Sequence, residues 1–166
     1  MKKWLLLVFA FLIIGLSLIL ILNRKEGETT DVYQSFEVYF STKDAMYLKA
    51  ETRKLNEDDI YKDAIRHLIM GPESNQLSST IPDEVELKEI EIRNKVAYID
   101  FNRSLIENHW GGSAGELLTV YSIVNTMTGF KEIEAVKILV EGNNMESLLG
   151  HMDLSEPLKR DESIIE

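Results

Sequence analysis

The residues with the clearest chemical potential are a serine in a glycine-rich segment and a histidine farther along the chain. Ser113 stands in the pattern G-x-S-x-G over residues 111–115, and His151 follows it, as in α/β-hydrolases. That motif requires an apolar strand running directly into the serine, and residues 106–110 (Ile-Glu-Asn-His-Trp) are not one. A helix start explains the pattern better, with Ser113 as N-cap and Glu116 completing a capping box. A cell-wall hydrolase using Ser113 and His151 is therefore the weaker alternative.

The remaining polar residues predict no catalytic, metal or cofactor site. The histidines are His67, His109 and His151, and they lack the spacing of metal-binding motifs. The carboxylates considered for glycoside cleavage are Asp100, Glu107 and Asp153. A chain with 28 acidic residues offers many such pairs, so this signal means little without geometry. Asn102 opens a glycosylation sequon, a pattern that is frequent by chance.

Trp110, next to His109 in the glycine-rich loop, has two interpretations that the sequence leaves open. An exposed indole there is an anchor for a protein partner, or a stacking platform for the sugar rings of peptidoglycan or another glycan. Alternatively, the ring folds onto a sheet ahead of the next helix.

The elements that must position these residues follow from local patterns. The predicted order is a hairpin of strands 35–40 and 46–50, a helix from N-cap Asn56 to Gly71-Pro72, a hairpin of strands 85–92 and 96–101, a helix from Ser113 to about Thr128, strand 133–140, and a short last strand after a turn at 141–144. This order predicts an α+β fold, one mostly antiparallel sheet with two helices on one face.

The N-terminal segment predicts a membrane anchor. Residues 4–22 carry no charge and would rise about 28 Å as a helix, enough to cross the hydrocarbon core of a bilayer. The run ends without the small residues of a cleavage site, and the chain has no cysteine for lipid attachment. We expect an uncleaved single-pass anchor at 1–25 with the N-terminus inside, a flexible tether at 26–34, an extracytoplasmic domain at 35–158 and a frayed acidic tail at 159–166.

Charge restricts the partners. All 28 acidic residues follow Lys25, whereas four of the 18 basic residues precede Glu26, so the chain beyond Lys25 has a net charge of about −14. Such a surface repels phosphate backbones, which argues against nucleic-acid binding.

Four stretches together resemble the GerMN domain family of sporulation and spore germination proteins. They are the helix end 68–72 with residues 77–82, the strand 96–101 with Asn102, the helix start Gly112-Ser113, and residues 138–142 running on to 149–158. The resemblance covers about residues 36–158.

The resemblance implies a non-enzymatic domain outside the bacterial membrane, similar in fold to the ring-building modules of secretion and sporulation complexes. It makes Gly71-Pro72, Gly112-Ser113 and residues 153–158 architectural signature positions. This chain has one copy where several relatives have two, and an apolar segment where many have a lipidated cysteine. We expect a membrane-anchored interaction domain in an envelope assembly, with other envelope or sporulation proteins or further copies of itself as partners, contacting them through a sheet edge and helix faces.

Overall fold

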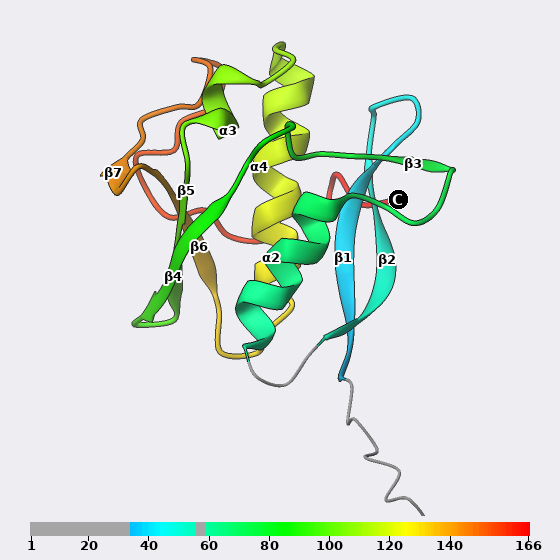
Figure 1. Ribbon diagram of the computed structural model, residues 1–166, viewed down its shortest axis with the longest axis horizontal. Helices are drawn as coiled ribbons and strands as arrows, with labels where there is room; N and C mark the ends of the chain where they lie inside the picture. The colour runs from blue at the N-terminus through cyan, green and yellow to red at the C-terminus, as the bar shows by residue number, and fades with distance from the viewer. Residues whose placement is uncertain (1–33, 56–58) are drawn as a thin grey trace, which may run out of the picture. The chain divides into compact units, whose positions relative to one another are not determined.

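The structure is a computed structural model that describes residues 34–55 and 59–166. Its elements are β1 (Gln34–Thr42), β2 (Leu48–Leu55), α2 (Ile60–Met70), β3 (Leu77–Ser78), β4 (Leu87–Arg93), β5 (Val96–Phe101), α3 (Ser104–Glu107), α4 (Ser113–Met127), β6 (Ala135–Val140) and β7 (Asn143–Asn144) (Figure 1). The predicted anchor at 1–25, residues 26–33 of the predicted tether and the predicted N-cap Asn56 lie outside the described residues. Of the helices in the described part, none has the length and apolar character needed to span a membrane.

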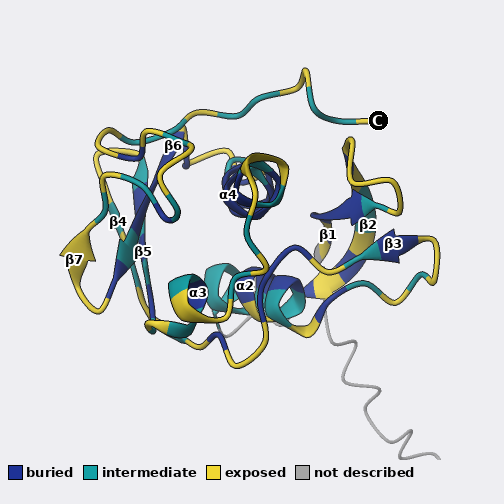
Figure 2. Ribbon diagram, turned by 90° about the horizontal axis from the view of Figure 1, so that it is seen from above, coloured by how far each residue is buried: buried dark blue, intermediate teal, exposed yellow. Residues whose placement is uncertain are grey.

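The strands form two sheets rather than one. β2, β1 and β3 make one sheet in that order, and β4, β5, β6 and β7 make the other. Helices α2 and α4 lie between the two sheets (Figure 2). The α+β class is confirmed, but the prediction of a single sheet with both helices on one face is wrong. Local patterns identify a strand and its buried face, whereas sheet membership depends on partners far away in the chain.

Strand pairing is mostly antiparallel. The two predicted hairpins are confirmed, with Ser41 opposite Leu48 in the first and Arg93 opposite Val96 in the second. β5 and β6 pair in parallel, because the chain leaves the end of β5 and returns through α4 to the start of β6. This crossover places α4 against one face of the sheet that contains β5 and β6.

Because α4 is buried between the two sheets, both sheets pack against the same hydrophobic core. Ten of its residues are buried, whereas α2 buries only three, Ala64, Ile65 and Leu68. A helix that is buried nearly all round cannot lie on the surface of a single sheet. The core cluster accordingly joins Val38 and Phe40 of β1 with inward-facing residues of the second sheet such as Ile99 and Ile138.

The helix boundaries agree with the predicted positions in part. Gly71 ends α2 with φ of 83°, and its N–H donates to the carbonyl of Leu68 at 3.2 Å. At the other end of α2 the N-cap is Asp59, whose carboxylate accepts the N–H of Lys62 at 3.2 Å. The helix thus begins later than an N-cap at Asn56 would allow.

The predicted capping box at the start of α4 is wrong, although the start of the helix is confirmed. Gly112 occupies the N-cap position and no side chain caps the helix there. Its carbonyl accepts the N–H of Glu116 at 3.0 Å. Ser113 is therefore the first helical residue, and the Glu116 side chain is free to point elsewhere.

The C-terminal residues are packed, not frayed as expected for 159–166. Asn125 of α4 donates from Nδ2 to the carbonyl of Asp161 at 2.9 Å and accepts the N–H of Asp161 at 3.0 Å. Ile164 and Ile165 pack beside a small cluster that contains Leu48. Leu48 donates its N–H to Ile164 at 2.7 Å, so the tail lies along one edge of β2.

Candidate functional site

Ser113 and His151 do not form a hydrolase pair. Both side chains are exposed, and no hydrogen bond joins them in the part of the chain that the structure describes. The acid nearest to this arrangement, Glu116, binds the backbone N–H of His151 rather than its imidazole, at 3.0 Å. A serine hydrolase needs its acid on the imidazole, where it fixes the tautomer. The geometry that activates a serine is therefore missing here.

Glu116 is instead the centre of a buried carboxylate site. One oxygen, Oε1, accepts Ser147 Oγ at 2.9 Å, Leu148 N at 3.0 Å and Leu149 N at 3.1 Å. The other, Oε2, accepts the N–H of His151. The side chain is fully buried, and its acceptor capacity is used by a single loop, residues 147–151. Glu116 therefore ties that loop to α4.

The electrostatics of Glu116 suit a structural carboxylate. Burial acts to raise its pKa, but the hydrogen bonds from Leu149, Ser147, His151 and Leu148 outweigh it, so the pKa lies below the ordinary value. A general acid needs the opposite shift. Sequence reasoning missed this role, because Glu116 and Ser147 are 31 positions apart in the chain and no local pattern connects them.

Residues 153–158, which follow this loop, close against the second sheet. Leu158 and Val136 exchange backbone hydrogen bonds of 2.8 Å in both directions. Lys137, a buried lysine of β6, donates from Nζ to the carbonyls of Leu154 and Ser155. The segment 153–158 is thus held by backbone and ammonium contacts.

The other candidate polar residues are separate and locally engaged. Asp100 accepts the N–H of Gly142 at 2.8 Å, and Asp153 accepts the N–H of Ser155 at 2.8 Å. Glu107 faces Arg103 one helical turn away. They do not form a carboxylate pair.

The amide of Asn102 in the sequon is also in use. It donates to the carbonyl of Glu84 at 2.9 Å and accepts the N–H of Glu86 at 3.0 Å. Within residues 34–55 and 59–166, no group of three histidine, aspartate or glutamate side chains is placed to hold a metal ion.

Trp110 lies exposed at one end of the domain, which favours the anchor or platform interpretation over the folded one. Its side chain is 55% exposed. The ring packs on Gly115, where an added Cβ would come within 3.0 Å of the indole Nε1. A Cβ at this position would crowd the indole, so glycine permits its close approach to α4. Gly115 therefore positions Trp110.

His109 connects the glycine-rich loop before α4 to the helix itself. Its Nδ1 accepts the N–H of Gly111 at 3.1 Å, so the ring proton is on Nε2, 3.0 Å from Thr119 Oγ1. The Thr119 hydroxyl donates onward to the carbonyl of Thr80 at 2.6 Å. Burial lowers the pKa of His109, although the charge of Glu116 acts in the opposite direction. The neutral imidazole therefore fits this network.

A hollow of about 250 Å³ opens beside Trp110, and we call it the Trp110 hollow. It is lined by Ser41, Thr42, Lys43, Ala45, Ser78, Ser79, Thr80, Trp110, Gly115 and Leu118. Its walls come from the β1–β2 turn, the chain around β3 and the start of α4, which meet at the same end of the domain (Figure 1). Hydroxyl groups dominate its polar lining.

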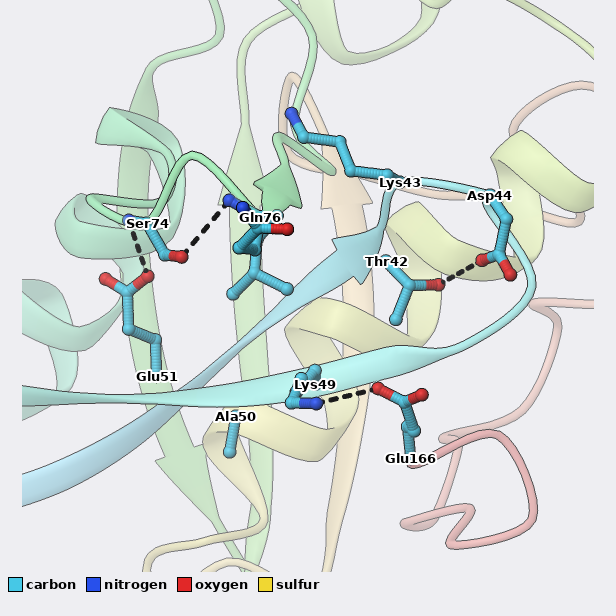
Figure 3. A pocket seen from close by; sticks show the side chains of 10 residues that line it. Thr42, Lys43, Asp44, Lys49, Ala50, Glu51, Ser74, Gln76 and Glu166 are labelled. Atoms are coloured by element: carbon cyan, nitrogen blue, oxygen red, sulfur yellow. Dashed lines mark hydrogen bonds and ion pairs between the residues drawn. The ribbon is translucent and has the colours of Figure 1, made fainter.

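A larger hollow of about 580 Å³ lies across β2 and the β1–β2 turn (Figure 3). Most of its polar groups are already paired within the chain. Lys49 contacts Glu166 at 2.8 Å, Thr42 donates to Asp44 at 2.6 Å, and Glu51 accepts the N–H of Ser74 at 3.1 Å. This hollow therefore offers a ligand few free groups, apart from those of Lys43, which also lines the Trp110 hollow.

Comparison with solved structures gives the fold a clear parallel. The tandem GerMN domains of the sporulation protein GerM from Bacillus subtilis are similar with a TM-score of 0.66 and 23% identity over 86% of this chain, which covers 51% of that structure. The first GerMN domain of the same protein gives 0.65 and 24% identity, covering 76% of this chain and 98% of that one. At these identities the likeness concerns the fold. This chain spans about half the length of the tandem structure.

A candidate lipoprotein from Clostridium perfringens is also similar, with a TM-score of 0.55 and 26% identity over 79% of this chain and 91% of that one. Curated protein sequences give no match. The family model described as Germane, sporulation and spore germination, matches residues 37–146, which is more than half of the chain. The predicted membership is confirmed: the chain belongs to the Germane family of sporulation and spore germination domains, and its fold is that of a GerMN domain.

Proposed function

We propose that this protein is a membrane-anchored, extracytoplasmic interaction domain in a bacterial envelope assembly linked to sporulation or germination. The anchor would be residues 4–22, and the domain would bind other envelope proteins or further copies of the chain without catalysing a reaction. The family match and the candidate lipoprotein among similar structures support the setting. The buried, hydrogen-bonded state of Glu116 supports a structural rather than a catalytic role for this carboxylate.

One observation carries the proposal: the β1–β2 turn presents large apolar side chains to solvent. Met46 is 62% exposed and Tyr47 is 42% exposed. Methionine and tyrosine are enriched at protein interfaces, where large side chains contribute most of the binding energy. Two side-chain hydrogen bonds hold the backbone of this turn: Thr42 Oγ1 accepts the N–H of Tyr47 at 3.1 Å, and Asp44 Oδ1 accepts that of Met46 at 3.2 Å. A preorganised apolar tip is suited to docking.

The structure favours this turn over the surfaces expected from the sequence. Helix α4 lies between the sheets and has little free face to offer. β4, at the end of the second sheet, carries Lys88, Glu89, Glu91 and Arg93. Charged side chains along an edge strand oppose pairing with another strand. We therefore place the interface at the β1–β2 turn.

Site-specific photo-crosslinking of the full chain in its own cells tests this interface. A photoreactive phenylalanine at Tyr47 should capture a discrete protein band, whereas the same residue at Arg66, on the exposed face of α2, should not. Equal capture from both positions, or none from Tyr47, would contradict the proposed surface.

The absence of cysteine allows a separate test of the location. Lys131→Cys adds one exposed thiol to a chain that has none. A membrane-impermeant maleimide should label this cysteine in protoplasts, which lack the cell wall but keep an intact membrane. Labelling that requires lysis would place the domain inside and contradict the proposed orientation.

A further inference from the structure

We infer that the Trp110 hollow binds one sugar ring of the cell-wall glycan, stacked on the indole of Trp110. The inference rests on the proposed function only for the extracytoplasmic setting, where such a glycan is present. The binding itself is argued from three features of the hollow: an aromatic platform, a buried hydroxyl without a partner, and a lining whose charge and size fit a sugar.

The platform is the indole of Trp110, one of the lining residues of the hollow. Trp110 is more than half exposed, and its position is set by close contact with Gly115 and by the His109 ring, whose centroid lies 5.2 Å away. Its indole N–H has no hydrogen-bond partner among the described residues. A sugar ring presents an apolar C–H face that packs on such a ring, with polar groups around its edge.

Thr80 is a lining residue of the hollow and has a buried hydroxyl. Its Oγ1 is buried without a hydrogen-bond partner in the described part of the chain, and the residue is only 1% exposed. An unsatisfied buried hydroxyl is unfavourable, and native proteins usually satisfy such groups with protein, water or ligand. A sugar hydroxyl can both donate to and accept from this oxygen after rotation of the threonine side chain.

The size and charge of the hollow also fit a single ring. At about 250 Å³ it is smaller than the roughly 300–1,000 Å³ of sites for drug-sized ligands. Lys43 is its only charged lining residue and forms no ion pair within residues 34–55 and 59–166. The strongly acidic surface elsewhere disfavours polyanions, whereas a wall sugar with at most one carboxylate is compatible with a single lysine.

A protein side chain would suit the hollow less well. An apolar side chain would cover Thr80 without satisfying its hydroxyl, which leaves the unfavourable group in place. The lining hydroxyls of Ser78 and Ser79 make no hydrogen bond inside the described structure. A ligand with several hydroxyl groups offers the hydrogen-bond partners that an apolar side chain lacks.

The test uses the full-length chain in a sugar-free detergent, with Trp4→Phe as background. Because the chain has two tryptophans, this substitution leaves Trp110 as the only indole. The probe is soluble glycan of alternating N-acetylglucosamine and N-acetylmuramic acid. We expect a saturable change in Trp110 emission and a matching binding isotherm by calorimetry.

Two variants and one control separate binding from folding. Trp110→Ala should weaken binding at least tenfold by calorimetry. Thr80→Val keeps the shape and removes the hydroxyl, so it should weaken binding about three- to tenfold with an unchanged or higher Tm. Met70→Ala, at an exposed residue of α2 outside the hollow, should bind like the parent chain.

The inference is overturned if the glycan gives no saturable signal, or if Trp110→Ala binds as tightly as the parent. It is also overturned if Trp110→Ala removes the protein captured from Tyr47 while glycan binding persists. Glycan binding lost in Trp110→Ala, with capture from Tyr47 retained, supports it. Failure of glycan binding alone leaves the protein interface at the β1–β2 turn as a separate proposal.

Discussion

Glu116 of α4 accepts the backbone N–H of His151 at 3.0 Å, across 35 residues of chain. The same carboxylate binds two more backbone N–H groups and one hydroxyl of the loop 147–151. This single side chain therefore ties the loop 147–151 to α4, just ahead of the segment 153–158 that pairs with the second sheet.

Glu116→Gln should destabilise the domain strongly. The amide replaces one acceptor oxygen by a donor that faces an N–H group, so the free energy of unfolding should fall by about 2–4 kcal/mol. Urea denaturation of the two proteins measures the difference. Glu107→Gln, at an exposed residue, serves as control and should remain within about 0.5 kcal/mol of the parent. Equal midpoints for all three proteins would show that the buried carboxylate is dispensable.

The lowered pKa of Glu116 predicts an acid-sensitive contribution to stability. Its carboxylate stabilises the fold above the unfolded-state pKa, about 4.3, and this contribution is lost as the pH falls through the lower folded-state value. Between pH 5 and pH 3 the parent should therefore lose more unfolding free energy than Glu116→Gln. Parallel pH profiles would contradict the assigned shift.

His109 predicts a second effect at higher pH. Its folded-state pKa is lowered, so the folded protein resists the proton that the unfolded chain accepts below about pH 6.5. Unfolding free energy should fall as the pH drops from 7.5 to 5.5, and the fall should be smaller in His109→Gln. Denaturation at several pH values gives both slopes; identical slopes would remove His109 as the cause.

The two helix starts predict contrasting effects of alanine. Asp59 caps α2 with its side chain, so Asp59→Ala should cost about 1 kcal/mol of stability. Ser113 makes no cap, so Ser113→Ala should change stability by less than about 0.5 kcal/mol. Thermal denaturation of both variants measures the contrast, and a larger loss for Ser113→Ala would restore the capping box.

Asn125→Ala should release the C-terminal tail. It removes both hydrogen bonds to Asp161 and should lower the free energy of unfolding by about 1–3 kcal/mol. Hydrogen exchange should speed up at the amides of Leu48 and Glu166, which bond across the tail and β2. Ser163→Ala, in the same tail, should leave these amides protected. Unchanged exchange in Asn125→Ala would mean that the tail is held by other contacts.

The local elements of this domain are well determined by the sequence. Alternation of apolar residues located both hairpins, and helical spacing located the two main helices with their ends at Gly71 and Thr128. The order of short motifs identified the family. These features depend on residues within about four positions of one another, so a one-dimensional pattern contains them.

The tertiary structure alone decided what Glu116, Thr80 and the C-terminal tail do. Glu116 matched a capping box in the sequence, yet its partners lie more than 30 residues away. Nothing around Thr80 in the sequence marks a hydroxyl without a partner. The division into two sheets likewise arises from pairing between distant strands. Contacts between distant residues depend on how all the helices and strands pack around one core. The residues next to them in the sequence therefore do not reveal these contacts.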